Sequence, residues 1–243
     1  MMVETKDMSC SSLGYREQIE RIKEFSSGEK EIYDSSLFEL LHIRERVANA
    51  RVLDIGAMAL RSSADIARAG AQYVCVIEPH PFGVESQITS GLSELIKWHS
   101  QIRGYDPQRV RIVQDYAGRG LDIRRLGVFD AAYFFFPPIP MIGNHIEYSL
   151  VHNEEEFRRL VESVCGALDS KGTFTIVSEV PPDCLRTVNV EGFERKIQRL
   201  PGKPLYSEIE RLAGWFLSSH PLIVTPIRPA SSLALSVLEY SRT

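Results

Sequence analysis

The chain has 243 residues, of which 44% are apolar and 25% are charged. This length suits one large domain, or one domain with a small appendage, and the composition excludes collagen-like, coiled-coil and disordered chains. With 28 basic and 32 acidic residues, the net charge is -4 at pH 7. This balance disfavours nucleic acid as a partner and gives no electrostatic reason to expect binding to an anionic membrane.

The four cysteines, Cys10, Cys75, Cys165 and Cys184, stand far apart in the sequence. They form no C-x-x-C pair and no Cys/His spacing suited to zinc, so we expect no metal site and interpret Cys75 and Cys165 as small core residues. The polar start lacks the apolar region of a secretory signal, and no apolar run reaches about 18 residues. We therefore expect a cytoplasmic protein without a membrane-spanning segment.

The N-terminal part of the sequence differs in pattern from the rest. Apolar residues recur at helical spacing over residues 15–25. A second helix is expected over residues 36–47, because the serine at its start and Glu39 three residues later form a capping box. We interpret residues 1–49 as a tail with a helical lid, and residues 50–243 as the main domain.

From Arg51 onward, short apolar runs alternate with helical segments, a pattern typical of βαβ units around a parallel sheet. Five runs are apolar enough for strands that are covered on both faces: Val52–Ile55, Tyr73–Ile77, Val110–Val113, Phe129–Phe135 and Thr173–Val177. Two further runs, Leu222–Ile227 and Leu233–Tyr240, have a link too short for a crossover helix, which predicts antiparallel neighbours. The fold class is therefore α/β, with a doubly wound, mostly parallel seven-stranded sheet, an antiparallel last strand and N-terminal helices.

Helices are predicted in the gaps between these strands, as follows: one that ends at Gly70, one over residues 84–102 with Gly104 as its C-cap, one capped by Asn153, and one over residues 209–217. The residues from Pro181 to Pro204 are rich in proline and polar side chains. This composition predicts an irregular insertion.

The first predicted strand and its loop carry the most informative motif, Asp54-Ile-Gly56-Ala57. A strand that leads into a glycine turn and a helix, followed by a second strand ending in an acid, is how open α/β sheets build a nucleoside site. The acid here is Glu78. Backbone can approach a ligand closely at Gly56, helix amides lie nearby, and the Glu78 carboxylate can accept both hydroxyls of a ribose.

In this motif the chain resembles the class I (Rossmann-like) S-adenosylmethionine-dependent methyltransferases, whose first motif is an acid, any residue and then Gly-x-Gly-x-Gly. Asp54 and Gly56 match it, whereas Met58 and Leu60 stand where the later glycines are usual. A methionine at the second glycine position either crowds the methionine part of the cofactor or turns its side chain away.

The order of parts extends the resemblance over residues 51–243. Residues 168–172 resemble the family's Leu-x-Pro-Gly-Gly turn before the fifth strand, and Asp115 matches the position that reads the adenine amino group. The resemblance implies S-adenosylmethionine as cofactor, with Asp54 helping to hold its ammonium. The implied cofactor-binding residues are Asp54, Gly56, Ala57, Glu78, Pro79, Asp115, Tyr116 and Phe135.

Each of these positions also has a purely structural interpretation. The loop can be a degenerate turn that binds nothing, and Asp54 can be a partner of the helix dipole. Glu78 can belong to a surface ion pair, and Asp115 can be satisfied by local amides. The sequence leaves these alternatives open.

The run of residues 133–140 lies where this family binds methyl acceptors, and it is reminiscent of the Asn/Asp-Pro-Pro-aromatic motif. Phe136 cannot accept a hydrogen bond from a planar nitrogen, and Ile139 replaces the stacking aromatic, which disfavours base or amide N-methylation. Two interpretations of residues 133–140 remain: they line the mouth of an aromatic pocket, or they pack in the core. His145 is the candidate catalytic base because histidine titrates nearest to neutral pH, with Glu179 as a second candidate; a surface role is the alternative for both.

The sequence therefore predicts a methyltransferase that uses S-adenosylmethionine to methylate oxygen or nitrogen of a small-molecule acceptor, and it leaves a homodimer open. Such an in-line displacement depends on alignment and needs no protein nucleophile. One alternative is an aminocarboxypropyl transferase resembling nicotianamine synthase. Another, motivated by Met58 and Leu60, is a non-catalytic partner subunit. Binding of NAD is disfavoured because only Gly56 of G-x-G-x-x-G is present.

Overall fold

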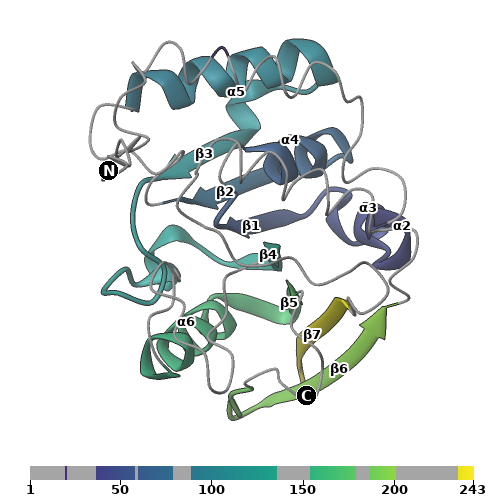
Figure 1. Ribbon diagram of the computed structural model, residues 1–243, viewed down its shortest axis with the longest axis vertical. Helices are drawn as coiled ribbons and strands as arrows, with labels where there is room; N and C mark the ends of the chain where they lie inside the picture. The colour runs from purple at the N-terminus through teal and green to yellow at the C-terminus, as the bar shows by residue number, and fades with distance from the viewer. Residues whose placement is uncertain are drawn as a thin grey trace, which may run out of the picture.

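A seven-stranded sheet in the order β3-β2-β1-β4-β5-β7-β6 forms the centre of the molecule (Figure 1). The computed structural model describes residues 20, 37–57, 60–78, 89–135, 154–178, 187–200 and 235–243. The strands are β1 (Arg51–Ile55), β2 (Tyr73–Ile77), β3 (Val110–Val113), β4 (Phe129–Phe135), β5 (Leu168–Ser178), β6 (Phe193–Leu200) and β7 (Leu235–Arg242).

The pairing of the strands confirms the predicted fold class. Strands β1 to β5 pair in parallel, whereas β7 is antiparallel to both β5 and β6. The strand order reverses between β1 and β4, and this is the switch point at which doubly wound sheets bind ligands beyond their carboxyl ends.

Helices cover both faces of the sheet. They are α2 (Leu37–Leu40), α3 (Ile43–Val47), α4 (Arg61–Arg68), α5 (Thr89–Arg103) and α6 (Glu154–Gly166), with short 3-10 helices η3 (Pro107–Arg109) and η4 (Ile123–Leu126). Figure 1 shows α4 and α5 at one side of the sheet, α6 at the other, and α2 and α3 together beside the sheet. The predicted C-cap of α5 is confirmed, since the Gly104 amide donates to the Ser100 carbonyl and Gly104 has φ 73°.

Alternate side chains of each strand feed two apolar clusters, one on each face. The cluster under α2 to α5 contains strand residues such as Val52 and Val74. The cluster under α6 contains Leu53 and both predicted core cysteines, Cys75 and Cys165. Burial raises the pKa of both thiols, to about 12 for Cys165, so these cysteines are packing residues and poor nucleophiles.

Four sequence-based expectations are wrong. Residues 36–47 do not form one helix, because His42 adopts a left-handed conformation (φ 50°) that separates α2 from α3. One continuous helix would point Phe38 and Ile43 about 140° apart, whereas the break buries both. The insertion ending at Pro204 contains β6, an edge strand whose exposed charged side chains hide its strand pattern. Because β7 pairs with β5 on one side and β6 on the other, the predicted antiparallel pairing of Leu233–Tyr240 with Leu222–Ile227 is wrong as well. Ile102 does not face the core and is 52% exposed.

Several expected elements lie outside the described residues. These are the strand Leu222–Ile227, the helix over residues 209–217, the cap residue Asn153 and, apart from Glu20, the helix over residues 15–25. The boundary between a lid of residues 1–49 and the main domain stays a prediction.

Two buried tyrosines on opposite faces predict opposite responses to loss of their hydroxyls. The Tyr240 hydroxyl donates to the Val188 carbonyl at 3.0 Å and accepts from the Val188 amide, whereas the buried Tyr133 hydroxyl has no hydrogen-bond partner in the part of the chain that the structure describes. We expect Tyr240→Phe to lower the free energy of unfolding by about 1–2 kcal/mol, and Tyr133→Phe to leave it unchanged or raise it by about 1 kcal/mol. Urea unfolding measures both changes, and equal losses would contradict this account.

Candidate ligand site at the carboxyl edge of the sheet

The turn after β1 brings backbone to the carboxyl edge of the sheet. Gly56 has φ 67°, a left-handed conformation that glycine adopts without strain. Its amide donates to the Ile77 carbonyl at 2.9 Å, which ties the end of β1 to the end of β2. Ala57 follows, and its carbonyl accepts from the Leu60 amide at 2.8 Å, so the loop turns directly into α4.

Leu60 occupies the position of the third glycine in the family's Gly-x-Gly-x-Gly motif, and its backbone has the left-handed conformation that glycine favours. Its φ is 59° and its ψ is 23°, which costs a residue with a Cβ roughly 1–2 kcal/mol. The side chain is 1% exposed and belongs to the core cluster under α4, and its burial offsets that strain. The loop therefore retains the local backbone conformation at this position although the glycine is absent. Met58 lies outside the described residues.

Asp54 is completely buried and holds the start of α4. Its Oδ2 atom accepts hydrogen bonds from the hydroxyls of Ser62 and Ser63, each at 2.6 Å. Its Oδ1 atom is also buried and has no hydrogen-bond partner within the described ranges. Burial raises the pKa of this carboxyl to about 6, although the two serine hydroxyls act in the opposite direction. Asp54 thus combines a bond to the first turn of α4 with one oxygen left over.

Ser62 and Ser63 were not among the residues expected at the site. They are buried in the first turn of α4, eight and nine positions after Asp54. Two adjacent serines at the start of the helix that follows an acid-x-Gly motif were the available signal. Nothing in the spacing alone indicates that both hydroxyls converge on one carboxylate oxygen.

Glu78 follows β2 directly and is only 3% exposed, so it does not lie on the surface. Its amide donates to the Val113 carbonyl at 3.1 Å, which holds the ends of β2 and β3 together. A buried carboxylate at this edge of a doubly wound sheet is placed where such folds bind ribose hydroxyls.

Asp115 and Tyr116 lie beyond the end of β3. The exposed Asp115 carboxylate accepts from the Tyr116 amide at 2.7 Å through Oδ1, as the local-amide interpretation expected. The Tyr116 ring is half-buried, with the Arg119 guanidinium 4.7 Å from its centre. A hydrogen bond to one oxygen leaves the Asp115 carboxylate with further acceptor capacity.

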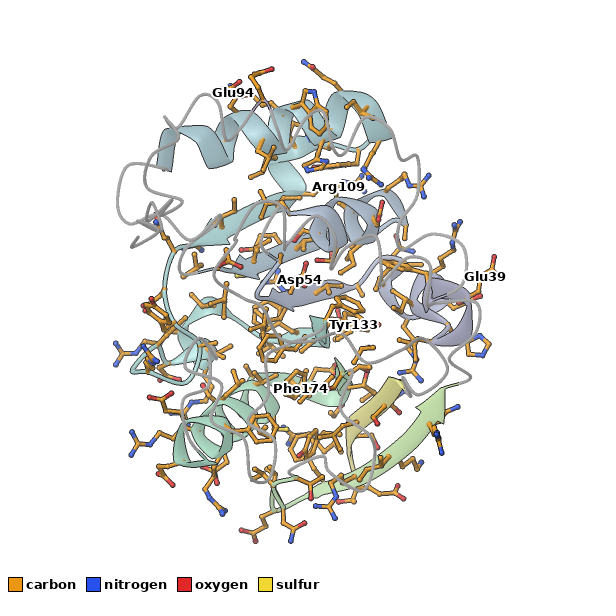
Figure 2. The ribbon with its side chains drawn as sticks, in the orientation of Figure 1. Glu39, Asp54, Glu94, Arg109, Tyr133 and Phe174 are labelled. Atoms are coloured by element: carbon orange, nitrogen blue, oxygen red, sulfur yellow. The ribbon has the colours of Figure 1, made fainter. Side chains whose placement is uncertain are left out.

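Phe135 ends β4 in an aromatic stack that includes an N-terminal helix. Its ring centre lies 5.5 Å from that of Tyr133 and 6.4 Å from that of Phe38 on α2, and both pairs are near parallel. The ion pair between Arg46 on α3 and Glu239 on β7 holds the neighbouring helix onto the sheet. Figure 2 shows Asp54 and Tyr133 side by side, in agreement with their register on β1 and β4.

Because β3, β2, β1 and β4 are parallel neighbours, their carboxyl ends lie at one edge of the sheet. This edge brings together seven of the expected site residues: Asp54, Gly56, Ala57, Glu78, Asp115, Tyr116 and Phe135. Pro79, His145 and Glu179 lie outside the described residues. Within the described ranges, no group of His, Cys, Asp or Glu is placed to hold a metal ion, and no helix is long and apolar enough to cross a membrane.

Sequence comparison finds no matching protein-family model and no matching curated protein. Solved structures do match. SpnF, a [4+2]-cyclase, aligns with a TM-score of 0.52 and 17% identity over 85% of this chain and 79% of its own. A proposed SAM-dependent methyltransferase from Streptococcus mutans aligns with a TM-score of 0.50 and 15% identity, over 82% of this chain and 46% of its own. The proposed methyltransferase yhhF from Escherichia coli aligns with a TM-score of 0.50 and 12% identity, over 92% of this chain and 87% of its own. Together with the strand order, these likenesses show that the chain has the class I (Rossmann-like) fold of S-adenosylmethionine-dependent methyltransferases.

Proposed function

We propose that the protein is an S-adenosylmethionine-dependent methyltransferase that acts on oxygen or nitrogen of a small-molecule acceptor. Because a [4+2]-cyclase has a similar fold, the fold alone does not select this activity. The observation that carries the proposal is the buried Asp54 carboxylate beside the left-handed turn at Gly56, one oxygen of which has no partner among the described residues.

The residues at this edge fit the cofactor part by part. Asp54 Oδ1 is an acceptor suited to an ammonium group, and Glu78 is an acceptor suited to the two ribose hydroxyls. Asp115 has acceptor capacity for the adenine amino group, next to Tyr116. Pro79 and Phe135 complete the proposed binding set, with Phe135 giving it an apolar wall. When bound, the cofactor supplies a methyl group on a positively charged sulfur.

The protein's contribution to the reaction would be alignment, exclusion of water and movement of one proton. Methyl transfer is an in-line displacement in which proximity and orientation supply much of the rate. We assign proton removal from the acceptor hydroxyl or amine to His145. Phe38 on α2 stacks over Phe135, which supports a role for residues 1–49 in covering the acceptor side of the site.

The acceptor class is supported by charge and by the aromatic stack. The net charge of -4 offers no attraction for a polyanion such as RNA. The rings of Tyr133, Phe135 and Phe38 are buried in the core, and they make the interior beneath this edge of the sheet apolar, which suits a small, partly apolar acceptor. We place the enzyme in the cytoplasm, as the sequence predicts, and a homodimer remains part of the proposal. The rival aminocarboxypropyl transfer would yield methylthioadenosine instead of S-adenosylhomocysteine.

Calorimetric titration with S-adenosylmethionine and S-adenosylhomocysteine tests this function. We expect micromolar binding to the wild-type protein, weakened about 30-fold in Glu78→Ala, because a buried carboxylate that accepts from hydroxyls contributes about 2 kcal/mol. Glu162→Ala, which removes an exposed acid of α6, is the matched control and should bind normally. If the folded wild-type protein binds neither ligand, the proposed cofactor is wrong and a non-catalytic partner subunit becomes the better interpretation.

A further inference from the structure

The strongest unexplained feature of the site is that both serine hydroxyls meet the same oxygen of Asp54. Ser62 and Ser63 each donate to Oδ2 at 2.6 Å, while Oδ1 accepts no hydrogen bond from any residue that the structure describes. A buried carboxylate oxygen without a donor is costly, and such atoms are rare in folded proteins. The asymmetry between the two oxygens therefore indicates that the partner of Oδ1 is not among the described residues, and a bound ligand is one source of such a donor.

The surroundings of Asp54 specify the chemistry of that partner. Its register neighbours are Val76 on β2 and Tyr133 on β4, and α4 contributes the two serines. Two described ion pairs on this face are internally matched, since Asp65 on α4 pairs with Arg103 on α5, and Arg46 on α3 pairs with Glu239 on β7. An oxygen that can only accept, on a group that carries negative charge when ionised, favours a compact cation with N–H donors such as a primary ammonium.

We propose that Ser62 and Ser63 are positioning residues, which hold Asp54 by Oδ2 and thereby present Oδ1 to the ammonium group of a bound amino-acid ligand. This inference rests on the proposed function, because it assigns the amino-acid end of the cofactor to Asp54. The serines do not contact the ligand. They set the rotation of the carboxylate and favour its ionised form through two charge-assisted hydrogen bonds.

The same geometry makes recognition of the ammonium dependent on pH. Burial raises the pKa of Asp54 to about 6, and the two hydroxyl donors counteract that rise. Above that pH the carboxylate is charged and attracts an ammonium; below it, proton uptake removes the attraction. Loss of a serine hydroxyl raises the pKa further, so the pH at which binding weakens should move upward. The nearest strand neighbour with a titratable side chain is Tyr133, whose pKa burial also raises, so its hydroxyl stays neutral throughout this range.

The test compares two ligands that differ only by the amino-acid part. S-adenosylhomocysteine carries the ammonium, whereas 5′-methylthioadenosine lacks the aminocarboxypropyl group. Both are titrated by calorimetry into the wild-type protein, Ser62→Ala, Ser63→Ala and the double variant, between about pH 5 and about pH 8. Ser100→Ala is the matched control, because Ser100 is a buried helical serine whose hydroxyl donates to the Lys97 carbonyl on α5.

We expect each serine variant to weaken S-adenosylhomocysteine binding roughly tenfold near neutral pH, to leave methylthioadenosine binding unchanged, and to move the pH midpoint of the first ligand upward. Ser100→Ala should change neither ligand. Equal weakening of both ligands, or a pH midpoint that does not move, would show that the serines only stabilise the loop. Failure of the wild-type protein to bind either ligand would instead overturn the proposed function, and this inference with it.

Discussion

Asp65→Ala is expected to lower the free energy of unfolding by about 3–5 kcal/mol, because it leaves the Arg103 guanidinium buried without its carboxylate. The pair joins α4 to α5, and its side chains are only 2% and 3% exposed. Replacing both partners by apolar residues, as in Asp65→Leu with Arg103→Met, should recover most of the loss, since neither charge then stays buried. Urea unfolding of the wild-type protein, the single variant and the double variant measures these differences.

An exposed ion pair provides the control for this experiment. Glu155 and Arg159 pair at 3.1 Å on the surface of α6, four residues apart. Glu155→Ala should cost less than about 0.5 kcal/mol, because exposed pairs contribute little. If Asp65→Ala costs no more than Glu155→Ala, or if the double variant is as unstable as the single one, the buried pair does not hold α4 and α5 together as we infer.

The parallel part of the sheet could be predicted because its strands are covered on both faces. Residues Tyr73–Ile77, Val110–Val113 and Phe129–Phe135 match the observed strands at both ends. Burial on two faces requires continuous apolar runs, and Gly56 and Gly70 mark the turns beside them. These signals are local, so a single sequence carries them.

The misjudged elements depend on contacts between distant parts of the chain. Strand β6 exists because β7 pairs with it, and its charged residues from Glu194 to Arg199 face solvent at the edge of the sheet. The break at His42 allows Phe38 to reach Phe135 and Ile43 to enter the core, almost a hundred residues away in the first case. Neither constraint has a local signature.

For the candidate site, the positions of the residues could be predicted from the sequence, whereas their hydrogen bonds could not. Asp54 and Glu78 were expected at strand ends, and they lie there. Burial of both carboxylates follows from the packing of α4 and the neighbouring strands, which no spacing rule reports. The backbone of Leu60 was equally hidden from the sequence. The sequence indicates only that the glycine is missing, whereas the structure shows that the left-handed conformation is kept. Motif matching alone therefore underestimates how much of the loop conformation survives.

Asp54→Asn is expected to raise the free energy of unfolding at about pH 7 by up to about 3 kcal/mol, and to change it little near pH 4. The folded pKa of about 6 lies above the ordinary value of 3.8, so the folded state binds the proton more tightly than the unfolded state. The stability that Asp54 contributes in its neutral form is present below about pH 4 and is lost as the pH rises through about 6. The asparagine keeps an oxygen for Ser62 and Ser63 and removes the titration.

Urea unfolding of the wild-type protein and Asp54→Asn from about pH 4 to about pH 8 measures this window. Asp115→Asn, which removes one exposed carboxylate, controls for the change in net charge. If the wild-type protein and Asp54→Asn differ in free energy of unfolding by the same amount at every pH, ionisation of Asp54 does not destabilise the folded state. The expected gain has a functional counterpart, because the variant also lacks the negative charge that an ammonium needs. If Asp54 served packing alone, asparagine would fit the same place and give a more stable protein at neutral pH. A carboxylate that lowers the free energy of unfolding there is therefore expected of a residue that binds a ligand.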